Sequence, residues 1–304
     1  MMVRFFARRL FGLVAVVVMV TVVTWISIHG LRPEAFAFDT RPTLQQLGDY
    51  LVQAFLHLEF GNSWENNQPP VAGMLRAGLP ADLQLLLGGM AFGLLLGITA
   101  GTFVGSRHRS RAGRLVEGVS MIFLCAPVYV VGLSVLLLFG VGIAITGIGI
   151  VPVKYVPFDE SPLRWLGSMI VPWIVVGLPL AAVCERMMNS SMREVLHEEF
   201  VRTALSKGIS HRRMLRRHAV PAAAAPVLTL AGVTVPVMVT NMVLVELTFS
   251  IPGVFQTFRS SMDNEDYPVI MGIVISAAVL VALGSLLVDL ALAWLDPKTR
   301  ASTA

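Results

Sequence analysis

The chain has 304 residues, of which 55% are hydrophobic and 14% charged, and its mean hydropathy is +0.74. A soluble domain carries about 25% charged residues, so the composition excludes a soluble globular protein and a disordered one. It indicates an integral membrane protein. Two cysteines, Cys125 and Cys184, are too few for a disulfide framework, and we expect both to be buried as small apolar side chains.

Six stretches lack ionisable side chains, and each has the roughly 20 residues that a helix needs to cross a bilayer. They are Leu10–Ile28, Leu83–Ser106, Gly118–Val153, Trp165–Cys184, Ala219–Val245 and Tyr267–Val288. The third is too long for one helix, and we expect it to span from Gly118 to about Gly140 and then leave the helix in a glycine-rich segment ending near Pro152. Basic residues precede the first stretch as in a signal peptide, but its length favours a retained helix.

Charge sets the expected orientation. With the N-terminus inside, 17 of the 23 Lys and Arg residues fall in the cytoplasmic pieces, as the positive-inside rule requires. The predicted fold is therefore all-α, with six transmembrane helices and both termini cytoplasmic. We divide it into an N-terminal helix (1–30), an extracytoplasmic loop (31–82) and a core of five helices (83–304) with a long cytoplasmic loop (185–218).

The predicted spans contain no ionisable side chain, which argues against an ion-driven carrier or a channel with a charged ring. No phosphate-binding loop or nucleophile elbow is present, and His197-Glu198 lacks the second histidine of a zinc site because position 201 is valine. We therefore expect no catalytic residue, no metal and no cofactor on this chain. If ATP drives it, another subunit must bind the nucleotide.

The second stretch carries a glycine at every fourth position, which predicts a face where another helix approaches closely. The members of this stripe are Gly89, Gly93, Gly97, Gly101 and Gly105. In the outer loop, Thr43 to Gln46 has the spacing of a capping box. Apolar residues from Leu44 to Leu58 then predict an amphipathic helix.

The cytoplasmic loop predicts an elbow of two helices. Ser190 or Ser191 is expected to cap a helix that runs to Lys207. Gly208 then supplies the left-handed position that ends it. Ser210 is expected to cap a second, short and very basic helix.

The same segment carries a resemblance to a known family. Residues 199–210 (EFVRTALSKGIS), followed by basic pairs and by Pro226-Val227-Leu228-Thr229, resemble the cytoplasmic loop of ABC importer permeases. Arg202-Thr203-Ala204 stands where general importers have Glu-Ala-Ala, as in the dipeptide/oligopeptide group, which also contains nickel permeases. Residues 60–63, 79–83, 246–254, 266–268 and 287–300 resemble other family motifs in the same order.

The resemblance implies a type I ABC importer permease in a prokaryotic inner membrane, with peptides as cargo and no nucleic acid partner. Its partners would be membrane lipid, a second homologous permease, an extracytoplasmic binding protein and two cytoplasmic ATPases that hold ATP and Mg. A nickel or other small-solute permease, and an autonomous channel or exporter, are the alternatives. The residues that would couple to the ATPase are Glu199, Arg202, Thr203, Ala204, Lys207 and Gly208. The candidates for an outer gate are Glu246, Pro252 and Gly253.

Overall fold

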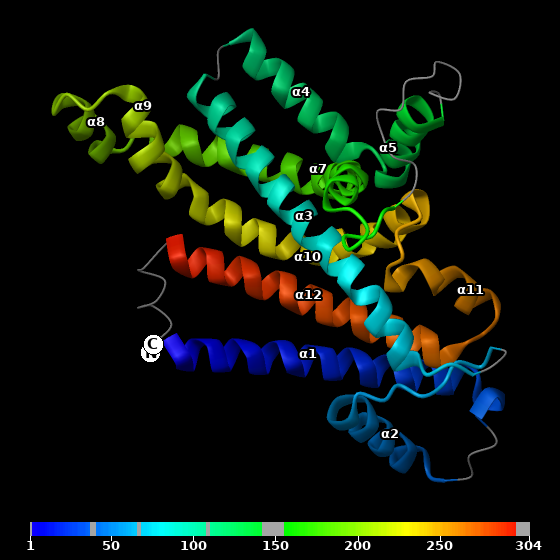
Figure 1. Ribbon diagram of the computed structural model, residues 1–304. Helices are drawn as coiled ribbons and strands as arrows, with labels where there is room; N and C mark the ends of the chain where they lie inside the picture. Colours follow the sequence, from blue (N-terminus) through cyan, green and yellow to red (C-terminus); the bar gives the residue numbers. More distant parts are fainter. Residues whose placement is uncertain (1, 37–40, 66–67, 108–109, 142–154, 296–304) are drawn as a thin grey trace. The chain divides into compact units, whose positions relative to one another are not determined.

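The computed structural model describes residues 2–36, 41–65, 68–107, 110–141 and 155–295. Within these ranges every regular element is a helix (Figure 1), as the sequence predicts. Among the described residues, five helices are long and apolar enough to cross a membrane, and a bent helix pair raises the number to six if it counts as one span. The five are Arg8–Leu31, Val71–Ser106, Pro162–Val195, His211–Phe249 and Tyr267–Trp294, and the bent pair is Arg111–Cys125 with Val128–Leu138.

The chain forms two compact units, which we describe separately. The first contains Leu85–Phe249 and the residues from Gly284 on, and the second contains Met2–Gln84 and Ser250–Leu283. Helices α3 (Val71–Ser106) and α12 (Tyr267–Leu295) each contribute to both units.

The second unit begins with α1 (Met2–Leu31) and the short turn η1 (Pro33–Phe36). Helix α2 (Thr43–Val52) continues into a π turn, η2 (Gln53–His57). The predicted capping box is wrong: Thr43 is already helical, and the preceding Pro42 has no side chain that accepts a hydrogen bond. The unit closes with the turn η5 (Val254–Thr257), helix α11 (Phe258–Asp263) and the first half of α12.

Two buried carboxylates fix the loops of this unit. Asp82, fully buried on α3, accepts hydrogen bonds from the Val254 backbone N–H at 3.1 and 3.2 Å. Asp266, 1% exposed, accepts from the Ser63 hydroxyl at 2.5 Å and from the Trp64 N–H at 3.2 Å. Because an unpaired buried carboxylate is costly, these bonds hold the connecting segments in one position.

In the first unit, the second half of α3 packs against α7 (Pro162–Val195) through all five glycines of the predicted stripe. A Cβ atom on Gly97 would lie 2.7 Å from the Ala181 carbonyl oxygen. One on Gly101 would lie 2.6 Å from the carbonyl oxygen of Glu185. The prediction of close helix packing is confirmed.

The third predicted span is broken. Helix α4 (Arg111–Cys125) and helix α5 (Val128–Val135), which continues into the π turn η3 (Leu136–Val141), meet at an angle of 106°. The expectation of one helix from 118 to 140 is therefore wrong. Pro127, which caps α5, lacks the N–H that would continue α4 and disfavours a helical conformation at the residue before it.

Burial of the cysteines is confirmed for Cys184 and wrong for Cys125, which is exposed at the end of α4. The glycine-rich segment that was expected to end near Pro152 lies outside the described residues. So do Asp296 to Arg300 of the C-terminal motif.

The helices of residues 185–218, the segment predicted to be cytoplasmic, also differ from prediction. Helix α7 runs to Val195, so Ser190 and Ser191 lie inside it and cap nothing. The reason is that Met188 and Met192 extend the apolar face of α7. They lie one helical turn apart, and both are fully buried. Helix α8 (Glu199–Ser206) follows after three residues.

The expected second short helix is the start of a long one. Helix α9 (His211–Met214) passes through the π turn η4 (Leu215–Ala219) directly into α10 (Val220–Phe249). Ser210 occupies the N-cap position but makes no side-chain capping bond.

We predict that Gly97→Ala lowers the stability of the protein by about 1–3 kcal/mol, because the added methyl overpacks the contact between α3 and α7. The matched control is Gly118→Ala in α4, where nothing lies within 4 Å of the added Cβ. That change should leave stability unchanged or raise it, since alanine loses less backbone entropy in a helix. Thermal unfolding of both variants in the same detergent measures the difference, and equal melting temperatures would contradict the packing.

Candidate functional site

The candidate site is the elbow, which we define as residues 196–214. It consists of a three-residue turn after α7, then α8, the bend at Gly208, and α9 (Figure 1). The turn is closed by hydrogen bonds from the Leu196 N–H to the Met192 carbonyl at 3.0 Å and from the Glu198 N–H to the Val195 carbonyl at 3.1 Å. The elbow thus joins two long helices without a flexible linker.

Gly208 ends α8 in a Schellman motif. Its φ is +77°, as predicted from the sequence, and its N–H donates to the Leu205 carbonyl at 3.0 Å. The Ile209 N–H donates to the Ala204 carbonyl at 3.2 Å, which completes the two bonds of the motif. No described residue lies within 4 Å of a Cβ added at Gly208, so backbone conformation and not space requires glycine there.

The structure places five of the six predicted coupling residues on the exposed side of the elbow. Glu199, Arg202, Thr203, Lys207 and Gly208 are exposed. Ala204 is only 9% exposed and faces inward with Val201, so it can act on a partner only by supporting α8. The coupling role of these residues remains a prediction.

Two exposed apolar side chains were missed. Phe200 and Leu205 on α8 are 43% and 41% exposed. An aromatic and an aliphatic side chain in water beside charged neighbours are typical of a protein contact surface. The sequence supplies the apolar residue types, but the structure shows that Val201 and Ala204 occupy the inner face of α8, which leaves Phe200 and Leu205 outside.

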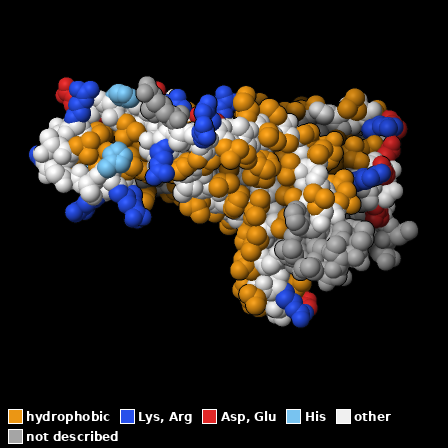
Figure 2. All heavy atoms as spheres, turned by 90° about the horizontal axis from the view of Figure 1, so that it is seen from above, with side chains coloured by type: hydrophobic (Ala, Val, Ile, Leu, Met, Phe, Trp, Pro, Cys, Tyr) orange, Lys and Arg blue, Asp and Glu red, His pale blue; other side chains and the backbone are white. Residues whose placement is uncertain are grey.

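A basic surface adjoins the elbow. Figure 2 shows Lys and Arg side chains gathered with histidines at the end of the visible face where α8 and α9 lie, beyond a broad hydrophobic area. The exposed basic residues from α9 and η4 are His211, Arg212, Arg213, Arg216, Arg217 and His218. We expect this positive charge to attract acidic groups on a partner.

A polar network fixes the end of α7 from which the elbow departs. The Asn189 amide and the Arg193 guanidinium on α7 donate to the Glu117 carboxylate on α4, at 2.7 and 3.0 Å. Arg193 also donates to the Asn189 side-chain oxygen at 2.9 Å. Nearby, the Glu185 side chain is 1% exposed; sequence reasoning missed it because it lies directly after the predicted span.

The three candidates for an outer gate belong to different units, and their role as a gate stays a prediction. Glu246 is fully buried on α10 in the first unit, whereas Pro252 and Gly253 belong to the second unit. Pro252 is exposed, and Gly253 has an extended conformation with φ −87° and ψ 174°. The segment after Gly253 is held close to α3, because a Cβ on Gly78 would lie 2.6 Å from the Val254 nitrogen.

Comparison with known proteins identifies the family. The family described as the inner membrane component of binding-protein-dependent transport systems matches residues 93–301. This chain belongs to that family. It is a permease subunit of an ABC importer, and it resides in the inner membrane of a bacterium, as the resemblance implied.

Similar proteins carry peptide-transport names. A putative peptide transport system permease of Brucella abortus is 30% identical over 86% of this chain and 81% of its own length. The oligopeptide transport system permease OppB of Haemophilus influenzae is 30% identical over 82% and 80% of the two chains. AppB of Bacillus subtilis, also an oligopeptide permease, is 30% identical over 79% and 75%. Membership of the family implies ATPase and binding-protein components as partners.

We predict that Gly208→Ala weakens the end of α8 by about 1 kcal/mol, because alanine resists a positive φ. Gly208→Asn should cost less, since asparagine tolerates this region better. Hydrogen exchange of peptides covering residues 204–210 measures the effect. Exchange should be fastest for Gly208→Ala, intermediate for Gly208→Asn and slowest for the unchanged chain; unchanged exchange in both variants would contradict the Schellman motif.

Proposed function

We propose that this chain is one of two homologous permease subunits that together form the path for di- and oligopeptides delivered by an extracytoplasmic binding protein. Two ATPases on the cytoplasmic side bind ATP and Mg, and this chain binds neither and catalyses no reaction. The distribution of Lys and Arg supports cytoplasmic termini. The peptide names of relatives that cover most of the chain support the cargo.

The elbow is the proposed ATPase contact. The observation that carries this proposal is the exposed pair Phe200 and Leu205, held on a short helix and bordered by charged side chains. Apolar anchors surrounded by polar groups are the usual centre of a protein interface. Glu199, Arg202 and Lys207 would make the surrounding contacts.

The connection of the elbow to long helices supports a lever mechanism. When the ATPases close on ATP, they displace α8, and because only three residues separate α8 from α7, the displacement reaches α7 directly. On the other side α9 continues into α10. The free energy of ATP binding thus shifts the population between two helix arrangements, inward-facing and outward-facing.

We predict that Phe200→Ala weakens ATPase binding by at least tenfold, because a central apolar anchor contributes about 2 kcal/mol or more to an interface. Gly208→Val should leave the chain in the membrane but uncouple ATP hydrolysis from uptake, since a β-branched residue resists the positive φ and redirects α9. Co-purification of the ATPases measures the effect of Phe200→Ala, and uptake per ATP hydrolysed measures the effect of Gly208→Val.

The matched control is Met262→Ala on α11, an exposed apolar residue that lies in a predicted extracytoplasmic loop. It should bind ATPase and transport normally. Normal coupling in both Phe200→Ala and Gly208→Val would overturn the role of the elbow.

The cargo is tested through the cognate binding protein. We expect di- or oligopeptides at 100 times their Kd to stabilise it by about 2.7 kcal/mol, measured as a rise in melting temperature. Free Ni²⁺, nickel chelates and glutathione serve as comparisons. Stabilisation by a nickel chelate alone would replace the peptide proposal with the nickel alternative.

A further inference from the structure

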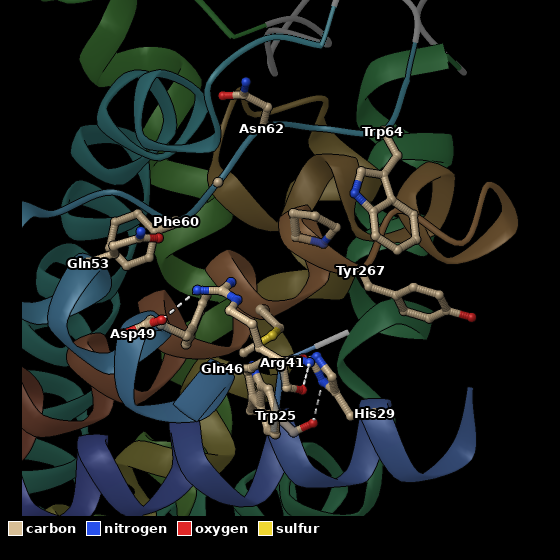
Figure 3. A pocket seen from close by; sticks show the side chains of 14 residues that line it. Trp25, His29, Arg41, Gln46, Asp49, Gln53, Phe60, Asn62, Trp64 and Tyr267 are labelled. Carbon is tan, nitrogen blue, oxygen red and sulfur yellow. Dashed lines mark hydrogen bonds and ion pairs between the residues drawn. The ribbon is translucent and has the colours of Figure 1, made fainter. Parts of the chain in front are cut away.

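A cavity of about 320 Å³ lies within the second unit. Trp25 and His29 of α1 line it together with residues of α2, the segment 60–64 and the start of α12 (Figure 3). Both α1 residues lie in the last two turns of the helix, where the apolar stretch Leu10–Ile28 ends. This is the level at which a spanning helix leaves the hydrocarbon and where tryptophan is enriched.

Two of the elements around the cavity present apolar side chains to their surroundings. On α1, Met19 is 68% and Ile26 is 54% exposed. On α2 and its π turn, Leu44 is 84% and Leu56 is 76% exposed. Both helices therefore offer an apolar outer surface beside a cavity with polar groups in its lining, which matches the change from acyl chain to headgroup in a phospholipid.

The cavity contains one charged group of each sign. The Arg41 guanidinium lies 2.6 Å from the Asp49 carboxylate, and Figure 3 shows the Arg41 side chain extending to it. Both side chains are about half exposed, at 51% and 45%, so a ligand can reach them. A zwitterion can lie antiparallel to this pair, with its anion on the guanidinium and its cation on the carboxylate, and the pair need not break.

The remaining walls supply an aromatic surround and a hydroxyl. Trp25 stacks on His29 with ring centroids 3.6 Å apart, and Trp64 meets Tyr267 edge-on at 5.4 Å. The Tyr50 hydroxyl is buried and has no hydrogen-bond partner among the described residues. Burial raises the pKa of Tyr50 above its ordinary range, so the hydroxyl stays a neutral donor.

We propose that this cavity binds the headgroup of a zwitterionic phospholipid with a primary ammonium, of the phosphatidylethanolamine class, its phosphate on Arg41 and its ammonium on Asp49. The cavity volume lies at the lower end of the range for small-molecule sites, about 300–1,000 Å³. This volume suits the headgroup of a phospholipid whose acyl chains lie outside the cavity along α1. It is too small to enclose an extended peptide of several residues.

The test is lipid binding to the intact, delipidated transporter, followed by native mass spectrometry. Phosphatidylethanolamine, phosphatidylcholine and phosphatidylglycerol are used with identical acyl chains. We expect phosphatidylethanolamine to bind at least tenfold more tightly than the other two, because it alone carries a cation that also donates hydrogen bonds to Asp49. Tighter or equal binding of phosphatidylglycerol would overturn the proposal in favour of an anionic lipid.

Variants assign the preference to the ion pair. Asp49→Asn should abolish the preference over phosphatidylcholine, and Arg41→Gln should weaken binding about tenfold, whereas Arg41→Lys should retain most of it. The matched control is Arg259→Gln, which removes an exposed arginine paired with Asp263 on α11 at 3.9 Å and should change nothing. An unchanged lipid preference in Asp49→Asn would overturn the proposal. Retained binding in Arg41→Lys would show that the loss in Arg41→Gln comes from the missing charge and not from misfolding.

Soluble competitors test the source of the headgroup. Free phosphoethanolamine should displace the lipid only at concentrations at least about 100-fold higher, because it lacks the acyl chains that anchor it beside α1. Displacement at equal concentration, or displacement by a di- or tripeptide, would show that the cavity takes a soluble zwitterion and would overturn the lipid assignment.

Discussion

The close packing of α3 against α7 is the contact on which the rest of the first unit depends. Apolar helices gain little from burial against one another in lipid, so they associate where small residues let their backbones approach. Both helices contribute here: a Cβ on Gly177 of α7 would lie 2.5 Å from the Gly89 carbonyl, and the α3 stripe continues along α7 as far as Met192. The contact therefore positions α7 along most of its length.

That position determines where the elbow can act. The Glu117 network holds α7 to α4 one turn before the helix ends, and α8 begins three residues after it. If the ATPase acts on α8 as proposed, the force reaches packed helices through only three intervening residues. The Schellman motif at Gly208 sets the direction in which the chain leaves α8, and α9 carries that direction into α10.

Local patterns were predictable from the sequence where a residue type has one dominant structural use. The glycine stripe and the positive φ of Gly208 are of this kind. Ser190 and Ser191 were misread because serine both caps helices and lies inside them, and only the burial of Met192 decides between the two. Whether Pro127 breaks the helix could likewise not be decided from the sequence, since membrane helices tolerate proline.

Contacts between distant parts of the chain could not be predicted. The hydrogen bond between Ser63 and Asp266 joins residues 203 positions apart. The sequence around either residue gives no indication of its partner. The same holds for the cavity beside α1, whose lining comes from four separate segments. The exposed pair on α8 was within reach of the sequence, but it required knowing which face of that helix is buried.

Photo-crosslinking in the intact transporter tests the central claim most directly. A photoreactive amino acid placed at position 200 should crosslink to the ATPase subunit, and the yield should change when ATP is bound, because the proposed ATPase contact is centred on Phe200. The same probe at position 262 should give no ATPase product. Crosslinks from position 200 only to lipid or to the other permease would contradict the account.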